Sequence, residues 1–406
     1  MSDIRTSDPP GTASRRAALR LLDAVLRKGL PLESALDAAA REIERIDDRA
    51  FAHAIAAEAL RRLADLDALI DRATRNRLPD DAKARFALRI ALVQALAMET
   101  PHHAAISTVL PLVDGGPRKL VHGVFSTIMR EKWALPAIPT LPEAVAERWR
   151  KAWGEDVVAA AARLIAVQPP IDLIGEPPAD LEGISLMPGH LRLARGAAVT
   201  ALSGYEGGKW WVQDISASIP ARLLGAGEGR TALDLCAAPG GKTMQLAAAG
   251  WDVTALDISQ SRLARLSENL ERTCLEAKIV AADLMKWKPE APVDAILLDA
   301  PCTATGIYRR HPDVLHRVRP RAIAELAEVQ KAMLGRAADW LKPGGTLIYS
   351  VCSLEPREGE QVSEDFIAAH ADYVLEERQR VLPGAYEDEG GADSFFIARF
   401  VRNKRG

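Results

Sequence analysis

Residues 233–243 read Leu-Asp-Leu-Cys-Ala-Ala-Pro-Gly-Gly-Lys-Thr, and this stretch decides the fold. It begins in an apolar segment of strand character, continues through small residues and two adjacent glycines, and leads into a segment of helix length. Small residues between a strand and a helix let the backbone approach a ligand closely, and the helix N-terminal amides point toward the polar groups of that ligand. The stretch therefore predicts a ligand-binding turn in an α/β domain.

Two other interpretations of the same stretch stay open at this point. Its end, Gly241-Lys242-Thr243, also matches the end of a phosphate-binding P-loop. A P-loop would require glycine at position 236, where this chain has Cys236, so the match is incomplete. The second alternative is a tight turn with a purely structural role.

Short apolar segments alternate with helix-length segments from about residue 211 onward, which predicts a parallel sheet flanked by helices. Each of the first five expected strands ends next to a residue whose side chain can take part in binding or catalysis. In an open α/β sheet, ligands bind outside the carboxyl ends of the strands, so these ends are expected to converge on one crevice. The expected strands are 231–235, 253–256, 278–281, 293–298, 346–351 and a late one near 395–400.

Carboxylates recur at three of these strand ends, as Asp257, Asp283 and Asp299. Asp257 lies 23 residues after Asp234, close to the spacing of about 20 at which an acidic residue binds ribose hydroxyls. Asp283 is suited to accept a hydrogen bond from an adenine amino group. A single aspartate of this kind is more often a strand-end or helix cap. Their recurrence at successive strand ends favours a shared adenosine site.

Two of the four cysteines, Cys302 and Cys352, follow the fourth and fifth expected strands. Most free cysteines are small buried hydrophobes, and Cys274 is interpreted in that way. A thiolate that adds to C6 of a pyrimidine activates C5 toward a methyl group, and a second thiol can assist loss of the C5 proton and elimination. Asp299 can contact either the cofactor or the N3 edge of the base. The pattern is consistent with pyrimidine C5 methylation.

The part of the chain before residue 211 divides into three segments. Residues 1–13 are polar and expected to be flexible, and residues 14–138 show apolar spacing typical of amphipathic helices. Breaks are expected at 29–31, 78–81, 100–101 and 114–117. Residues 139–210 are expected to form a small α+β connector domain, and residues 211–406 the α/β domain.

Composition excludes several classes of protein. The 406 residues are 48% apolar and carry a formal charge of -3, which excludes a mainly disordered chain and a globally basic nucleic-acid coat. The four cysteines are widely spaced without a C-x-x-C pair, which argues against a disulfide framework and a zinc site. No signal peptide and no run of about 18 apolar residues is present. We therefore expect a cytoplasmic protein without a metal or a membrane partner.

The motifs together resemble those of the RNA 5-methylcytosine methyltransferases that use S-adenosylmethionine. The resemblance is carried by residues 234–243, by Asp299-Ala300-Pro301-Cys302 and by Ser350-Val351-Cys352-Ser353. Residues 305–313, Thr-Gly-Ile-Tyr-Arg-Arg-His-Pro-Asp, are similar to the bacterial ribosomal branch called RsmB or Sun. That branch begins with an all-helical RNA-binding domain similar to the antitermination factor NusB. The resemblance implies a multidomain protein with an all-α NusB-like N-terminal domain, a small α+β middle domain and a C-terminal Rossmann-like class I methyltransferase domain.

The resemblance also implies roles for individual residues. Cys352 would be the nucleophile, Cys302 would promote product release, and Lys242 would steady Asp299 or the base. Gln213-Asp214 would help to close the cofactor pocket. Many relatives have Leu-Arg-Val-Asn where this chain has residues 171–175, which removes an arginine expected to contact RNA. The residues expected to bind S-adenosylmethionine are Cys236, Ala237, Ala238, Pro239, Gly240, Gly241, Lys242, Asp257, Asp283 and Asp299.

The expected partner is 16S ribosomal RNA, bound by a monomer before or during early assembly of the small subunit. Arg309 and Arg310 directly follow the catalytic loop, where the phosphates that flank an extruded base would lie, so we expect them to bind RNA. The basic cluster 83–89 is expected to be a solvated helix face balanced by acids. Two alternatives remain: the same chemistry on transfer RNA or another ribosomal site, and a non-catalytic RNA-binding, antitermination-like factor with a scaffold methyltransferase domain.

Overall fold

The structure of the protein is a computed structural model that describes residues 8–404. The chain divides into two compact units. The first comprises residues up to 151 together with 161–167 and 310–318, and the second comprises 152–160, 168–309 and the chain from 319 onward. Residues 1–7 of the expected flexible N-terminus lie outside the described residues, and the first helix begins at Thr12.

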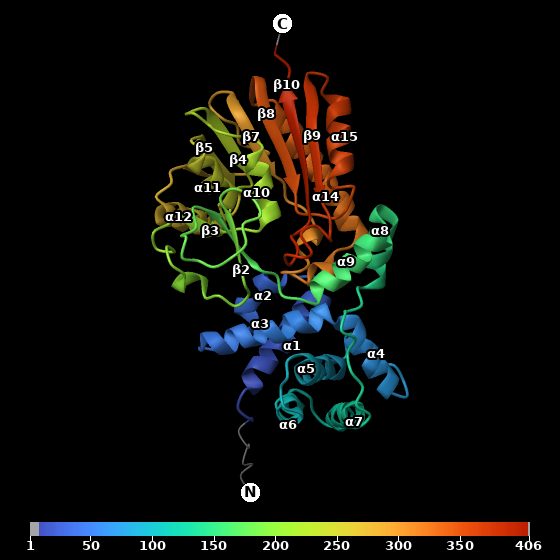
Figure 1. The fold of residues 1–406 in the computed structure, drawn as a ribbon. Coiled ribbons are helices and arrows are strands. Elements are labelled where there is room, and N and C mark those ends of the chain that lie inside the picture. The colour runs from blue at the N-terminus through green and yellow to red at the C-terminus, as the bar shows by residue number, and fades with distance from the viewer. Residues whose placement is uncertain (1–7, 405–406) are drawn as a thin grey trace. The chain divides into compact units, whose positions relative to one another are not determined.

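The first unit is helical, as the apolar spacing predicted (Figure 1). The expected breaks at 29–31, 78–81 and 100–101 fall between helices, and the break at 114–117 adjoins the start of the helix that follows it. Two further breaks, at 40–45 and at Arg62, were not predicted. The helices are α1 (Thr12–Leu26), α2 (Leu32–Ala39), α3 (Ile46–Arg61), α4 (Leu63–Ala73), α5 (Lys83–Ala97), α6 (His102–Ser107), the short η1 (Leu110–Leu112) and α7 (Gly116–Arg130), followed by α8 (Glu143–Trp153) and α9 (Glu155–Ile165).

Helix α5 is the central helix of this unit, since its residues 84–94 are buried on every face. A helix that is apolar all round belongs in a core, yet α5 carries Arg85 and Arg89 at buried positions. Both guanidinium groups pair with Asp67, at 3.1 Å and 2.8 Å. The expectation of a solvated face at 83–89 was therefore wrong for these two arginines. Acidic residues do balance their charges, but the arginine side chains are buried inside the helical unit.

The segment 310–318 belongs to the helical unit although it follows it by more than a hundred residues. Its short helix α13 (Val314–Arg317) buries Val314 and Leu315. His316 Nε2 donates to the Leu60 carbonyl oxygen at 2.7 Å, and burial lowers the pKa of His316 to about 4. These contacts depend on long-range packing, so the contiguous boundaries expected from the sequence did not include this segment.

The second unit contains a small antiparallel sheet in the order β2-β1-β3. Its strands are β1 (Ile171–Gly175), β2 (His190–Leu193) and β3 (Trp210–Val212), with the short helix η2 (Val199–Ala201) before β3. Strand β3 crosses the boundary expected between residues 210 and 211, and residues 168–210 of the expected connector lie in the same compact unit as the main sheet. Residues 139–151 and 161–167 of that connector belong to the first unit instead.

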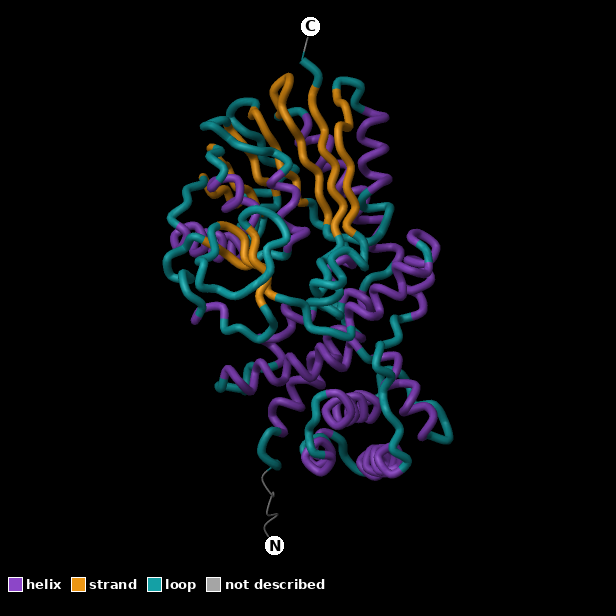
Figure 2. The backbone as a smooth tube through the Cα atoms, in the orientation of Figure 1, coloured by secondary structure: helices purple, strands orange, loops and turns teal. Residues whose placement is uncertain are grey.

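The main sheet has seven strands in the described part of the chain, in the order β6-β5-β4-β7-β8-β10-β9 (Figures 1 and 2). Strands β4 to β8 are parallel, and β10 and β9 are antiparallel to their neighbours. All six expected strands are present. Strand β9 was missed because it is a mostly exposed, charged edge strand without an apolar pattern. The strands are β4 (Thr231–Leu235), β5 (Asp252–Asp257), β6 (Lys278–Ala281), β7 (Val293–Asp299), β8 (Leu341–Val351), β9 (Tyr373–Val381) and β10 (Phe395–Arg402).

Helices cover both faces of this sheet and give a three-layer α/β/α arrangement. Alternating strand residues face opposite sides, so Ala232 packs with Leu246 of α11, whereas Leu233 packs in the cluster that contains Leu334 of α14. The helices on the first face are α10 (Ile215–Arg222), α11 (Gly241–Ala248) and α12 (Gln260–Thr273), and those on the second face are α14 (Pro320–Ala338) and α15 (Glu360–Ala369).

A buried ion pair ties the small sheet to the main domain. Asp172 of β1 accepts two hydrogen bonds from Arg192 of β2, at 2.7 and 2.9 Å, and one from the Ile215 amide at 3.0 Å. The Arg192 guanidinium also donates to the Glu389 carbonyl oxygen at 3.0 Å. Asp172 is thus a buried structural residue in the segment 171–175, where the resemblance implied the loss of an arginine expected to contact RNA.

Replacement of Asp172 with asparagine is expected to destabilise the protein by about 3 kcal/mol at pH 7, because it leaves the buried Arg192 without its counter-ion. Burial raises the pKa of Asp172, but hydrogen bonds from Arg192 and His190 outweigh it and lower the pKa to about 2. The carboxylate therefore stabilises the fold above pH 4, and that contribution is lost as the pH falls toward 2. Urea unfolding at pH 7 and pH 3 tests this; an equal loss at both values would contradict the assignment.

Candidate active site

The loop 236–240 joins β4 to α11 at the point where the strand order reverses, between β5 on one side and β7 on the other. Such switch points are where open α/β sheets bind ligands. Gly240 has φ +107°, and a Cβ there would lie 2.9 Å from Leu266 of α12. Glycine is required because another side chain would be strained and would clash, so the loop can lie flat against α12.

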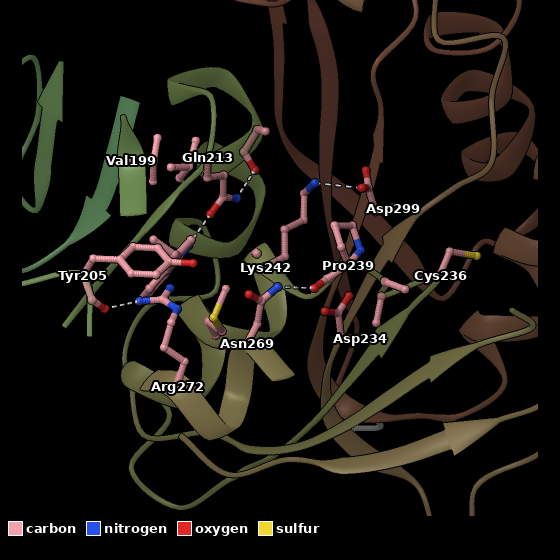
Figure 3. Close-up of a pocket in the computed structure, with 17 residues that line it drawn as sticks. Val199, Tyr205, Gln213, Asp234, Cys236, Pro239, Lys242, Asn269, Arg272 and Asp299 are labelled. Carbon is pink, nitrogen blue, oxygen red and sulfur yellow. Dashed lines mark hydrogen bonds and ion pairs between the residues drawn. The ribbon is translucent and has the colours of Figure 1, made fainter. Parts of the chain in front are cut away.

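A cavity of about 360 Å³ opens along this loop (Figure 3). Its wall includes residues 236–239, Gly241, Lys242 and Asp299, whereas Gly240 is not among the lining residues. On the other side it is lined by Tyr205 and Arg272. The cavity is thus bounded both by the β4 loop, as the sequence predicted, and by the segment that leads into β3, which it did not predict.

Asp234, at the penultimate position of β4, is a residue of this cavity that sequence reasoning used only as a spacing reference. Its carboxylate is buried, Oδ2 accepts from the Thr243 hydroxyl at 2.6 Å, and Oδ1 has no hydrogen-bond partner among residues 8–404. Burial raises the pKa of Asp234 to about 7. An unsatisfied buried oxygen in a cavity wall fits a ligand that brings a polar group. An aspartate inside an otherwise apolar strand is the signal that could have identified it.

Asp257 and Asp283 follow the neighbouring strands β5 and β6, outside the residues that line the cavity. Asp257 is buried and accepts from the Ala238 amide at 3.2 Å and the Ser259 amide at 2.9 Å. Asp283 is half-exposed and accepts from the Met285 amide at 2.9 Å. The structure brings the two carboxylates to adjacent strand ends beside the loop, as expected for an adenosine site.

Lys242 and Asp299 meet across the cavity. The Lys242 ammonium donates to Asp299 Oδ2 at 2.7 Å (Figure 3). The Ser350 hydroxyl donates to Asp299 Oδ1 at 2.8 Å. The Lys242 ammonium also lies 5.1 Å from the centre of the Phe395 ring. The expectation that Lys242 steadies Asp299 agrees with this geometry.

Cys302 and Cys352 are brought together by the parallel pairing of β7 and β8, and their Sγ atoms are 3.5 Å apart. Both cysteines are half-buried and neither is in a disulfide. The hydrogen bond with Cys352, together with burial, raises the pKa of Cys302 well above its usual value. Cys236 differs: it packs in the main core, and burial and the nearby Asp257 raise its pKa to about 12.

Arg309 and Arg310 do not form the exposed phosphate-binding pair that the sequence suggested. The Arg309 side chain is fully buried, donates to the Gly390 carbonyl oxygen at 2.6 Å and lies 3.8 Å from the Asp393 carboxylate. Arg310 is half-buried and begins the segment that belongs to the helical unit. In this conformation Arg309 has a structural role, because its guanidinium is not accessible to a phosphate.

Gln213 and Asp214 stand between β3 and α10, as expected for residues that close the cofactor pocket. Gln213 lines the cavity, accepts from Trp211 Nε1 at 2.8 Å and donates to Gln245 Oε1 at 2.9 Å. Asp214 caps α10 by accepting from the Ser216 amide at 3.0 Å. Gln213 is thus part of the cavity wall, whereas Asp214 is not among the lining residues.

Residues 8–404 contain no helix that is both long and apolar enough to cross a membrane. The same residues contain no group of three or more His, Cys, Asp or Glu side chains arranged to hold a metal ion.

The fold and the site define a Rossmann-like methyltransferase with an N-terminal NusB-like helical domain. Residues 221–401 match the family model described as 16S rRNA methyltransferase RsmB/F, and residues 12–130 match the NusB family. The chain belongs to the RsmB family of S-adenosylmethionine-dependent ribosomal RNA methyltransferases.

Curated relatives match nearly the whole chain. The ribosomal RNA small subunit methyltransferase B of Xylella fastidiosa (strain Temecula1) is 34% identical over 97% of this chain and 99% of its own. The protein of the same name from Klebsiella pneumoniae (strain MGH 78578) is 33% identical over 96% of this chain and 98% of its own. The crystal structure of PH0851 shares the fold with a TM-score of 0.73, at 22% identity over 97% of this chain and 99% of that chain.

Proposed function

We propose that the protein methylates C5 of a cytosine in 16S ribosomal RNA, with S-adenosylmethionine as the methyl donor. The observation that carries the proposal is the pair of thiols, Cys302 and Cys352, 3.5 Å apart at the same end of the sheet as the Lys242–Asp299 pair. Methylation of a heteroatom needs no nucleophilic thiol, whereas C5 of cytosine is unreactive until a nucleophile adds to C6. Two free cysteines side by side beside a cofactor loop suit that chemistry.

In the proposed reaction, the Cys352 thiolate forms a bond to C6 of the cytosine and makes C5 nucleophilic. When bound, S-adenosylmethionine supplies the methyl group that C5 takes up. The C5 proton is then transferred to a base, for which the Cys302 sulfur is close enough, and the bond between Cys352 Sγ and C6 breaks, which restores the C5–C6 double bond and the free Cys352 thiolate. Cys302 is near enough to assist the last two steps.

The chain's other residues would position the two reactants. Lys242 and Asp299 lie where they can contact the base or the cofactor, and their ion pair fixes each in place. The loop 236–241, Asp257, Asp283 and the unsatisfied oxygen of Asp234 would hold the cofactor. The target cytosine must leave its stack to reach Cys352, and Arg310 stays a predicted phosphate contact for the flanking RNA.

Incubation with a labelled methyl donor and unmodified 16S RNA tests the proposal. We expect label in the RNA, recovered as 5-methylcytidine after digestion to nucleosides. Unmodified transfer RNA and large-subunit RNA serve as competing substrates, and preferred transfer to either would replace the 16S assignment while keeping the chemistry. A Cys274→Ala variant is the matched control and should retain activity, because Cys274 is exposed at the end of α12. The expectation that Cys274 is a small buried residue was therefore wrong. Label in a different nucleoside, or no transfer to any RNA, would contradict the proposal.

A further inference from the structure

Glu358 is a buried carboxylate that the proposed reaction does not use. It is fully inaccessible to solvent, although it belongs to the loop between β8 and α15 rather than to a strand or helix. Burying a carboxylate is costly unless hydrogen bonds saturate its oxygens. The identity of its donors therefore indicates what the residue does.

Those donors come from the two loops that carry the thiols. Thr303, which follows Cys302, donates its amide to Glu358 Oε1 at 2.8 Å, and its hydroxyl donates to Oε2. Ser353, which follows Cys352, donates its hydroxyl to Oε2 at 2.5 Å. One carboxylate thus accepts hydrogen bonds from the immediate neighbours of both cysteines.

The rest of the environment fixes the carboxylate itself. Gln330 of α14 donates to Glu358 Oε1 at 3.1 Å and to the Pro301 carbonyl oxygen at 2.9 Å. The Tyr349 hydroxyl of β8 donates to the backbone carbonyl oxygen of Glu358 at 2.5 Å. Glu358 is therefore held from α14 and β8 while it holds the two thiol loops, and it occupies the centre of this network.

Direct hydrogen bonds also join the two loops around this centre, among them one from the Leu354 amide to the Thr305 hydroxyl at 3.0 Å. The Ser353 hydroxyl lies 3.3 Å from the hydroxyls of Thr303 and Thr305, and the Gly306 amide donates to the Cys352 carbonyl oxygen at 3.0 Å. A carboxylate offers about four acceptor sites, and here each oxygen receives two donors. No neutral side chain of the same size can accept from all four.

We propose that Glu358 is a positioning residue that holds the Cys302 and Cys352 loops at the separation the reaction requires. This inference rests on the proposed function for its catalytic meaning. The distance between the thiols, however, can be measured without catalysis. Displacements of about 1 Å in a reacting group are enough to cost about a hundredfold in rate, so a shared anchor has a direct kinetic consequence.

A trivalent arsenical reports the thiol pair independently of methylation. Phenylarsine oxide condenses with two adjacent thiols to form two As–S bonds and releases one water, with no change of oxidation state. We expect the wild type to capture one equivalent, and both Cys302→Ala and Cys352→Ala to lose capture. Glu358→Gln and Glu358→Ala should capture at least about tenfold more slowly, because the loops lose their common anchor.

Asp294→Asn is the matched control for the loss of an acceptor. The Asp294 carboxylate accepts from Thr231 and Lys342 at the opposite end of the sheet, so this variant should capture phenylarsine oxide at the wild-type rate. If the Glu358 variants do not fold, Thr303→Val and Ser353→Ala each remove one hydroxyl donor and should slow capture by a smaller factor. Capture within twofold of wild type in every folded variant of the network would overturn the inference.

Methylation kinetics supply the second readout. Glu358→Gln should lower kcat about a hundredfold and leave both KM for RNA and Kd for S-adenosylmethionine near their wild-type values. A general loss of structure would alter all three quantities. If the wild type captures the arsenical, the Glu358 variants do not, and no RNA is methylated, the positioning role stands and the proposed function fails. If the wild type methylates RNA and the Glu358 variants keep both capture and kcat, the proposed function stands and this inference fails.

Discussion

Cys352→Ala is expected to abolish methyl transfer, with kcat/KM lowered by about 10⁴-fold or more, because it removes the thiol that is proposed to add to C6 of the base. Cys302→Ala is expected to behave differently. It retains the nucleophile but lacks the thiol that assists release, so it should accumulate a covalent complex between Cys352 and RNA. Denaturing gel electrophoresis with labelled RNA detects that complex, and transfer of labelled methyl groups measures turnover.

The two cysteine variants show whether the thiols act in catalysis and also which of them is the nucleophile. A covalent complex in Cys352→Ala but not in Cys302→Ala would exchange the assignments. Full turnover by Cys352→Ala would exclude the thiol mechanism. The double variant gives the background, since it should neither turn over nor form a complex.

Asp299→Ala carries the second largest expected effect, a decrease in kcat of about 10²- to 10³-fold. The Asp299 carboxylate is held by Lys242 on one oxygen and by the Ser350 hydroxyl on the other, so its removal leaves the Lys242 ammonium without its partner and removes a hydrogen-bond acceptor from the cavity wall. Single-turnover methylation measures the chemical step, and equilibrium binding of S-adenosylmethionine measures the cofactor site.

Ser350→Ala is the conservative companion to that variant. It removes one hydrogen bond to Asp299 and keeps the ion pair with Lys242, so the decrease in kcat should be about tenfold or less. A wild-type kcat in Asp299→Ala would contradict a role for this carboxylate in either the base site or the cofactor site.

The sequence was sufficient to predict the convergence of the site because it depends on a regular rule. Parallel strands end at the same edge of a sheet, so Asp299, Cys302 and Cys352 could be placed together from strand order alone. The same rule brought Asp257 and Asp283 to adjacent strand ends. The approximate extents of six strands followed from apolar segments whose lengths and flanking residues are typical of strands.

The parts that escaped prediction depend on contacts between residues that are distant in sequence. Arg309 looked like an exposed cation because nothing local reveals that Gly390 and Asp393 close over it. Glu358 likewise sits among charged neighbours in a polar loop, and only packing shows that it is buried. Strand β9 was missed because an edge strand needs no apolar alternation.

The helical unit is discontinuous in sequence, and this affects how it can be made. Its last segment, residues 310–318, leaves the ribosome only after most of the α/β domain has been synthesised. Until then the Leu60 carbonyl oxygen lacks its partner His316, and the surface that receives Val314 and Leu315 is uncovered. The N-terminal helices therefore reach their final packing late in translation. For the same reason, a fragment that ends near residue 138 is an incomplete unit and should be less stable than the same helices in the whole chain.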